Sequence, residues 1–158
     1  MSAVSESSFF LEADEVLLDL IPKLSSSSSS SDQQKQQQEE ALNRIESIFD
    51  KYLECPSLLD SKLESIVSTL SKAASSIAHD IYNSQNNENG SSFPELLPCL
   101  ISNLSALYFI AKVRGSKQIQ KFLTHNASDV EPILQMLSLV PFNEWKAIYS
   151  LLLWIGML

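Results

Sequence analysis

The spacing of the apolar residues constrains this chain more than any other feature. Across most of the sequence these residues recur at intervals of three and four, which is the period of an α-helix with one buried face. Only three glycines and six prolines interrupt the 158 residues, and alternating β-branched residues are scarce. The sequence therefore predicts an all-α fold made of amphipathic helices.

Polar segments and prolines separate the expected helices. We place these helices at about residues 8–24, 39–55, 57–82, 94–114, 116–123, 128–139 and 143–158. The segment 94–114 is apolar on nearly every side, so it should be the most buried helix.

Several residues indicate where the expected helices bend, begin or end. Pro22 should bend or end the first helix, and Gly115 should terminate the helix before it in a left-handed conformation. Ser128 and Glu131 have the spacing of a capping box, and Asn143 is placed to cap the last helix.

The segment 25–38 is rich in serine and glutamine. Because such a composition buries little apolar area, we expect a flexible linker there, between an N-terminal helix (1–24) and a helical-repeat region (39–158). The repeat region is a series of antiparallel helix pairs, which favours an α-solenoid of HEAT or armadillo type. A compact helical bundle is the alternative. No strict repeat period is visible, but solenoid repeats diverge strongly.

Composition and motifs argue against several functions. The net charge of −8 argues against nucleic-acid binding. Cys55 and Cys99 form no disulfide framework and, with His79 and His125 standing alone, no metal-ligand pattern. No glycine-rich phosphate loop or nucleophile–base pair can be recognised, so we expect neither a cofactor nor an enzyme. A small hydrolase whose site is assembled only in space is the remote alternative.

Two features point to interactions with other proteins. The final segment 149–158 is nearly all apolar but too short to cross a bilayer, which takes about 20 apolar residues, so we expect a core helix and no membrane span. Lys112 and Arg114 follow the most apolar helix and are candidate contacts for an acidic partner. The alternative, which the residues alone favour, is that they complement the dipole at the helix end.

Four segments in series resemble a known family. They are DKYLECPSLLD (50–60), KVRG (112–115), DVEPIL (129–134) and YSLLLWIGML (149–158). They occur in the order, and at about the spacing, found near the N-terminus of tubulin-folding cofactor D, also called tubulin-specific chaperone D. The resemblance covers about residues 41–158.

The resemblance implies a function that the residues do not show by themselves. Members of this family are large cytosolic HEAT-repeat chaperones that capture β-tubulin and, with cofactors C and E, assemble the α/β-tubulin heterodimer. The assembled complex stimulates GTP hydrolysis by tubulin, and the chaperone associates with an Arf-like small GTPase. The family is not itself enzymatic. We accordingly expect a cytoplasmic protein associated with tubulin and microtubules.

Family members continue beyond the segment that ends this chain. We therefore expect an N-terminal fragment whose last helix is an interior solenoid layer without its neighbour, and which is marginally stable or self-associates. The side chains expected to be exposed at this interface are Tyr149, Leu152, Leu153, Trp154, Ile155 and Leu158. The alternatives are a generic HEAT-type adaptor, or a truncated product without independent activity.

Overall fold

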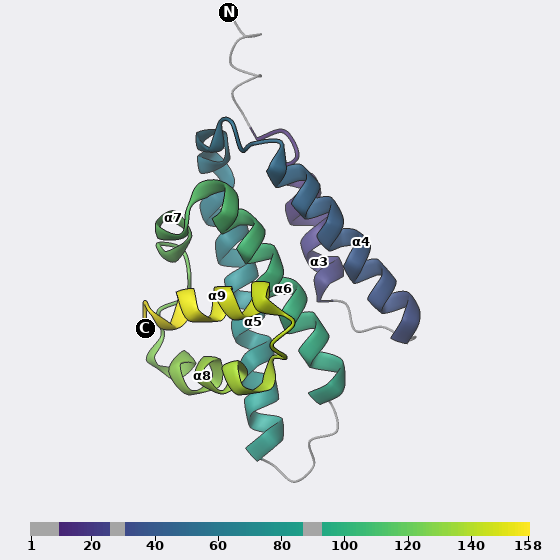
Figure 1. Cartoon of the computed structure of the whole chain (residues 1–158), viewed down its shortest axis with the longest axis vertical. Helices are drawn as coiled ribbons and strands as arrows, with labels where there is room; N and C mark the ends of the chain where they lie inside the picture. Colours follow the sequence, from purple (N-terminus) through teal and green to yellow (C-terminus); the bar gives the residue numbers. More distant parts are fainter. Residues whose placement is uncertain (1–9, 26–30, 87–92) are drawn as a thin grey trace, which may run out of the picture.

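A computed structural model of the chain describes residues 10–25, 31–86 and 93–158 (Figure 1). Every regular element in these ranges is helical, which confirms the all-α expectation. The elements are α2 (Ala13–Glu15), the π-helical turn η1 (Val16–Leu20), α3 (Ile21–Leu24), α4 (Ser31–Asp50), the 3₁₀ turn η2 (Pro56–Leu59), α5 (Asp60–Asn86), α6 (Phe93–Arg114), α7 (Ser116–Gln120), the 3₁₀ turn η3 (Ala127–Asp129), α8 (Val130–Leu139) and α9 (Trp145–Ile155).

The long helices α4, α5 and α6 form the body of the fold. α5 and α6 are antiparallel, because Asp60 at the start of α5 pairs with Arg114 at the end of α6. α4 runs parallel to α6, as two contacts show: Gln38 lies against Cys99 near the start of both helices, and Asp50 pairs with Lys112 near their ends. The pair α8 and α9 lies across α5 and α6 (Figure 1).

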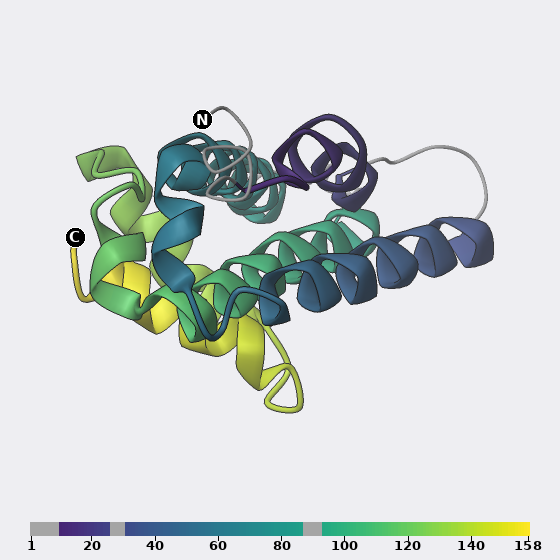
Figure 2. The ribbon, with the colours of Figure 1, turned by 90° about the horizontal axis from the view of Figure 1, so that it is seen from above.

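α6 is the central helix of the fold. It contacts α4, α5 and α9, and Leu100, Leu104 and Ile110 on it are completely buried. Figure 2 shows α4 and α6 lying between the N-terminal helices with α5 on one side and α9 on the other. By length and composition alone the window Leu96–Arg114 is apolar enough to cross a membrane, but 67% of it is buried inside the fold. The composition of a core helix accounts for that hydropathy.

The first helix continues past Pro22, which therefore does not end it. Proline has no N–H group, and its ring clashes with the carbonyl one turn earlier in a regular helix. Here the preceding turn is a π-helix, in which the N–H of Ile21 donates to the oxygen of Val16. The wider turn makes room for the ring, and the chain stays helical to Leu24.

The expected linker at 25–38 is wrong for its second half. α4 begins at Ser31, so the glutamine-rich part is helical, while residues 26–30 lie outside the described residues. Glutamine, lysine and glutamate are good helix formers. The side chain of Gln38 also has a buried place, since its amide donates to the oxygen of Leu24 at 3.3 Å and to Sγ of Cys99 at 3.2 Å. The described first helix likewise starts at Ala13, and residues 1–9 are not described.

Gly115 makes the sharp turn between α6 and α7. Its φ of 102° lies in the left-handed half of the backbone map, which favours glycine. Its N–H still donates to the oxygen of Ala111 at 2.8 Å, so α6 ends with its last turn closed. The expectation of a glycine terminator at this position is confirmed.

The expected caps of the last two helices are wrong. Ser128 lies inside η3, α8 begins after Asp129, and no side chain caps it. Glu131 does not close a capping box but accepts a hydrogen bond from the hydroxyl of Tyr82 on α5 at 2.8 Å. α9 also begins without a side-chain cap, so Asn143 does not have the expected role. At Glu131 a contact with α5 has taken the place of the local cap.

Asp129 joins the segment before α8 to α5. Its carboxylate is 2% exposed and accepts hydrogen bonds from Ser75 (2.8 Å), His79 (2.7 Å) and Thr124 (3.0 Å). Because a carboxylate can only accept, Nε2 of His79 carries the proton in this contact. Burial by itself would raise the pKa of Asp129, but the three hydrogen bonds outweigh burial and hold the pKa below its ordinary value.

Asp129→Asn should lower the free energy of unfolding by about 2 kcal/mol at pH 7, because charge-assisted hydrogen bonds are lost at a buried position. A carboxylate whose pKa is lowered in the folded state stabilises above its unfolded pKa of about 3.9 and loses that effect as pH falls through its folded pKa. The difference between the two proteins should therefore shrink below about pH 4. Denaturant unfolding from pH 7 to pH 3 measures it.

Asp80→Asn is the matched control, since Asp80 is an exposed carboxylate on α5. It should leave stability unchanged within about 0.5 kcal/mol. Equal stability of Asp129→Asn and the wild type at pH 7 would contradict the role given to this contact.

Candidate functional site

The two cations expected to meet a partner are engaged within the chain. Arg114 forms a two-pronged ion pair with Asp60, with Nη2 2.9 Å from Oδ2, and Lys112 lies 3.3 Å from Asp50. Hydrogen bonding by Arg114 holds the pKa of Asp60 below its ordinary value. These ion pairs connect α6 to α5 and to α4. Neither of the two interpretations made from the sequence, partner contact or complementation of the helix dipole, had included this role. Contact with a partner remains a prediction for both residues.

The residues expected at an exposed interface on the last helix differ in how far they are buried. Tyr149, Leu152 and Leu158 are exposed, and Leu153 and Ile155 are half-buried. The expectation is wrong for Trp154, which is completely buried and donates from Nε1 to the oxygen of Thr124 at 2.9 Å. Trp154 lies two turns after Ala147, on the face of α9 that is buried in the fold. That a further helical layer covers the exposed residues remains a prediction.

Trp145 extends the exposed face of this helix, and Phe142 is exposed in the turn that precedes it. Trp145, Tyr149 and Leu152 share one face of α9 at the spacing four, three, and together with Phe142 before the helix we call them the α9 stripe; the exposed fractions of Phe142, Trp145, Tyr149 and Leu152 are 97%, 54%, 40% and 56%. Edge contacts hold two of these rings: the ring centroid of Tyr108 on α6 lies 5.0 Å from that of Trp145 and 5.4 Å from that of Tyr149. Sequence reasoning missed Phe142 and Trp145, although the spacing of Trp145 from Tyr149 and Leu152 was visible in the sequence.

Lys146 adds a charge beside these rings. Its Nζ lies 4.9 Å from the ring centroid of Phe109 and 5.8 Å from that of Trp145. Such a cation–π contact at an exposed site contributes about 0.5–1 kcal/mol. The rings of Trp145 and Tyr149 in the α9 stripe therefore form a preformed aromatic surface, since contacts with Tyr108 hold them in place.

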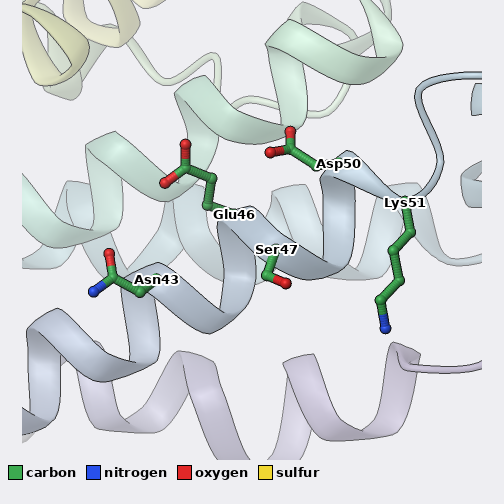
Figure 3. Close-up of a pocket in the computed structure, with 5 residues that line it drawn as sticks. All are labelled: Asn43, Glu46, Ser47, Asp50 and Lys51. Atoms are coloured by element: carbon green, nitrogen blue, oxygen red, sulfur yellow. The ribbon is translucent and has the colours of Figure 1, made fainter.

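A groove runs between α4 and α6 up to the α8–α9 loop. Its volume is about 300 Å³, and it is lined by Lys35, Gln38, Glu39, Leu42, Pro98, Ile101, Ser102, Ser105 and Glu144. A more open recess of about 490 Å³ lies beside the C-terminal half of α4 and is lined by Asn43, Glu46, Ser47, Asp50 and Lys51. In Figure 3, Glu46 and Asp50 point towards the ribbon of α6, and Lys51 points the other way, towards the N-terminal helices.

The cluster at Asp129 brings serine, histidine and aspartate together, which are the residue types of a catalytic triad. Ser75 donates to the carboxylate of Asp129 and not to His79, so the serine has no base beside it. A nucleophile–base pair needs that contact. The cluster is a structural tie between α5 and η3. In the described ranges no group of three or more His, Cys, Asp or Glu side chains could hold a metal ion.

Stacked helices with an exposed apolar stripe and open grooves define a helical-repeat protein of the α-solenoid class. The comparison with known families gives the particular member of that class. The profile of the family described as tubulin-specific chaperone D-like, ARM repeat, matches residues 49–158. The chain belongs to this family, which confirms the resemblance and the solenoid expectation over a closed bundle.

One relative shows how much of such a protein this chain represents. This chain is similar to tubulin-specific chaperone D of Dictyostelium discoideum, with 32% identity over 111 residues. That alignment covers 65% of this chain and 7% of the relative, so the chain spans a small part of the relative's length. No solved structure matches the chain.

The α9 stripe should make the isolated 158-residue chain self-associate, because exposed apolar surface of this kind is stabilised by contact with another copy. Leu152→Glu should shift the chain towards monomer, measured as mass by light scattering over a range of concentrations. Leu53→Glu is the control, since Leu53 is 48% exposed and lies outside the stripe. A wild-type chain that stays monomeric at all concentrations would contradict this expectation.

Proposed function

We propose that this chain is part of a tubulin-folding chaperone and contributes to holding β-tubulin through the α9 stripe. The observation that supports the proposal is the preformed aromatic surface at Tyr108, Trp145 and Tyr149 in a chain of the chaperone D-like family. Tryptophan and tyrosine dominate the energies of protein interfaces because they bury large areas at small cost in side-chain entropy.

A chaperone for a folding subunit needs a surface that binds apolar side chains reversibly. The α9 stripe offers rings and a leucine in one row, and Lys146 at its side can meet a carboxylate of the bound protein. A client that has not yet buried its own interface presents the complementary apolar surface. Contact by shape and apolar area thus suffices for the chaperone activity, without any chemical step.

The remaining parts of the proposal rest on family membership. They are assembly of the α/β-tubulin heterodimer together with cofactors C and E, association with an Arf-like small GTPase, and stimulation of GTP hydrolysis by tubulin in the assembled complex. A cytoplasmic location with microtubule association belongs to the same proposal. A generic adaptor role would instead give other partners in the same binding experiments.

Trp145→Ala and Leu152→Glu should each weaken capture of chaperonin-released β-tubulin by about tenfold or more, because both side chains are on the proposed contact. Pull-down at graded chain concentrations measures the effect. Leu53→Glu should bind like the wild type. If the two stripe variants abolish self-association and leave tubulin binding intact, the stripe is a packing face only and this part of the proposal is wrong.

Lys112→Glu and Arg114→Glu test the predicted partner contact against the ion pairs seen in the fold. Both residues form exposed pairs, and such pairs contribute about 0–1 kcal/mol, so reversal should not unfold the chain. If the cations also meet acidic residues of the partner, binding should fall in a salt-dependent way. Asp50→Lys and Asp60→Arg, which break the same pairs from the other side, should leave binding intact.

A further inference from the structure

We propose that the groove between α4, α6 and the α8–α9 loop is the docking site for a basic amphipathic helix of a partner protein. This surface is distinct from the α9 stripe, and the inference goes beyond the function proposed above. Three observations carry it: the two parallel helices that form the walls, the apolar floor, and the carboxylates on the rim.

The walls of the groove are two matching helical stripes. On α4 the lining residues are 35, 38, 39 and 42, and on α6 they are 98, 101, 102 and 105. Each set has the spacing i, i+3, i+4, i+7, which is one face of an α-helix over about two turns. Because α4 and α6 run parallel, these faces lie side by side for about 10 Å. Two parallel helical faces form the channel into which a third helix packs.

The floor of the groove is formed by apolar residues and by two small serines. Leu42, Pro98 and Ile101 are half-buried, so they are packed below yet still reachable from the groove. Ser102 and Ser105 are small side chains with exposed fractions of 6% and 5%, and they leave the volume above them open. An incoming leucine or isoleucine would cover the apolar floor and gain the free energy of that burial.

The rim gives the groove its charge preference. Glu39 on α4 and Glu144 before α9 line it, and Glu46 continues the acidic edge along α4. None of these carboxylates forms an ion pair with another residue that the structure describes. A partner helix with lysine or arginine flanking its apolar face would meet them, whereas Lys35 at one end prefers a carboxylate on the partner.

The overall charge argues against a second copy of this chain as the occupant. A second copy would bring a net charge of −8 against the carboxylates of this rim, whereas self-association through the α9 stripe buries apolar side chains. The same charge attracts a basic segment from a distance and increases its association rate at low salt. The groove is therefore matched to a cationic helix and not to the chain itself.

The first test uses a synthetic helical peptide of about 18 residues with leucine on one face and lysine on the other, measured by fluorescence anisotropy. Glu39→Lys combined with Glu144→Lys should weaken binding of this peptide by about tenfold, as expected for two ion pairs. Glu64→Lys combined with Asp80→Lys changes the net charge equally on exposed positions of α5 and should weaken it by about twofold at most. Equal weakening by both pairs would show non-specific attraction and overturn the proposal.

A second measurement keeps the proposal testable if a variant folds poorly. Amide chemical shifts of the wild-type chain, titrated with the same peptide, should move at residues 35–42 and 98–105. A twin peptide with glutamate in place of lysine should move none of them. Shifts confined to the α9 stripe, or equal shifts with both peptides, would overturn the proposal.

Discussion

Burial of α6 on several sides is the constraint on which the rest of the structure depends. α4, α5 and α9 all pack against this helix, and its residues Leu100, Leu104 and Ile110 are completely buried. Each such side chain contributes about 1.5–3 kcal/mol through removal from water. All three neighbouring helices therefore depend on the same central helix for their buried faces. The surfaces proposed for binding exist only because α6 holds α4 and α9 at fixed places.

Polar contacts fix the register of the helices that pack on α6. Apolar contact is not directional, so it tolerates sliding, whereas a buried hydrogen bond does not. The amide of Gln38 on α4 donates to Cys99, and the hydroxyl of Ser150 on α9 donates to the oxygen of Leu104. Burial also raises the pKa of the Cys99 thiol, despite its bond to Gln38, and keeps it protonated. The Gln38–Cys99 bond thereby fixes α4 against α6 in the groove, and the Ser150–Leu104 bond fixes α9, which carries the α9 stripe, against α6.

The sequence predicted the helices better than the contacts between them. Helical period and turn chemistry are local, so the all-α class and the turn at Gly115 followed from the residues themselves. The prediction of a flexible glutamine segment was wrong because Gln38 is buried against Cys99 on α6, about sixty residues further along the chain. The prediction that Trp154 is exposed was wrong because nearly every residue of its helix is apolar, so periodicity did not distinguish the packed face of the helix from the exposed one. Asp129 was missed for the same reason as Gln38, since two of its three partners, Ser75 and His79, come from α5.

The two proposed surfaces suit different kinds of partner, and the difference follows from their chemistry. The α9 stripe is aromatic and has a lysine beside it, so it favours apolar surface with an acidic fringe. The groove along α4 and α6 has an acidic rim and favours the opposite charge. Both border α6, whose Tyr108 supports the stripe and whose Ile101 forms part of the groove floor.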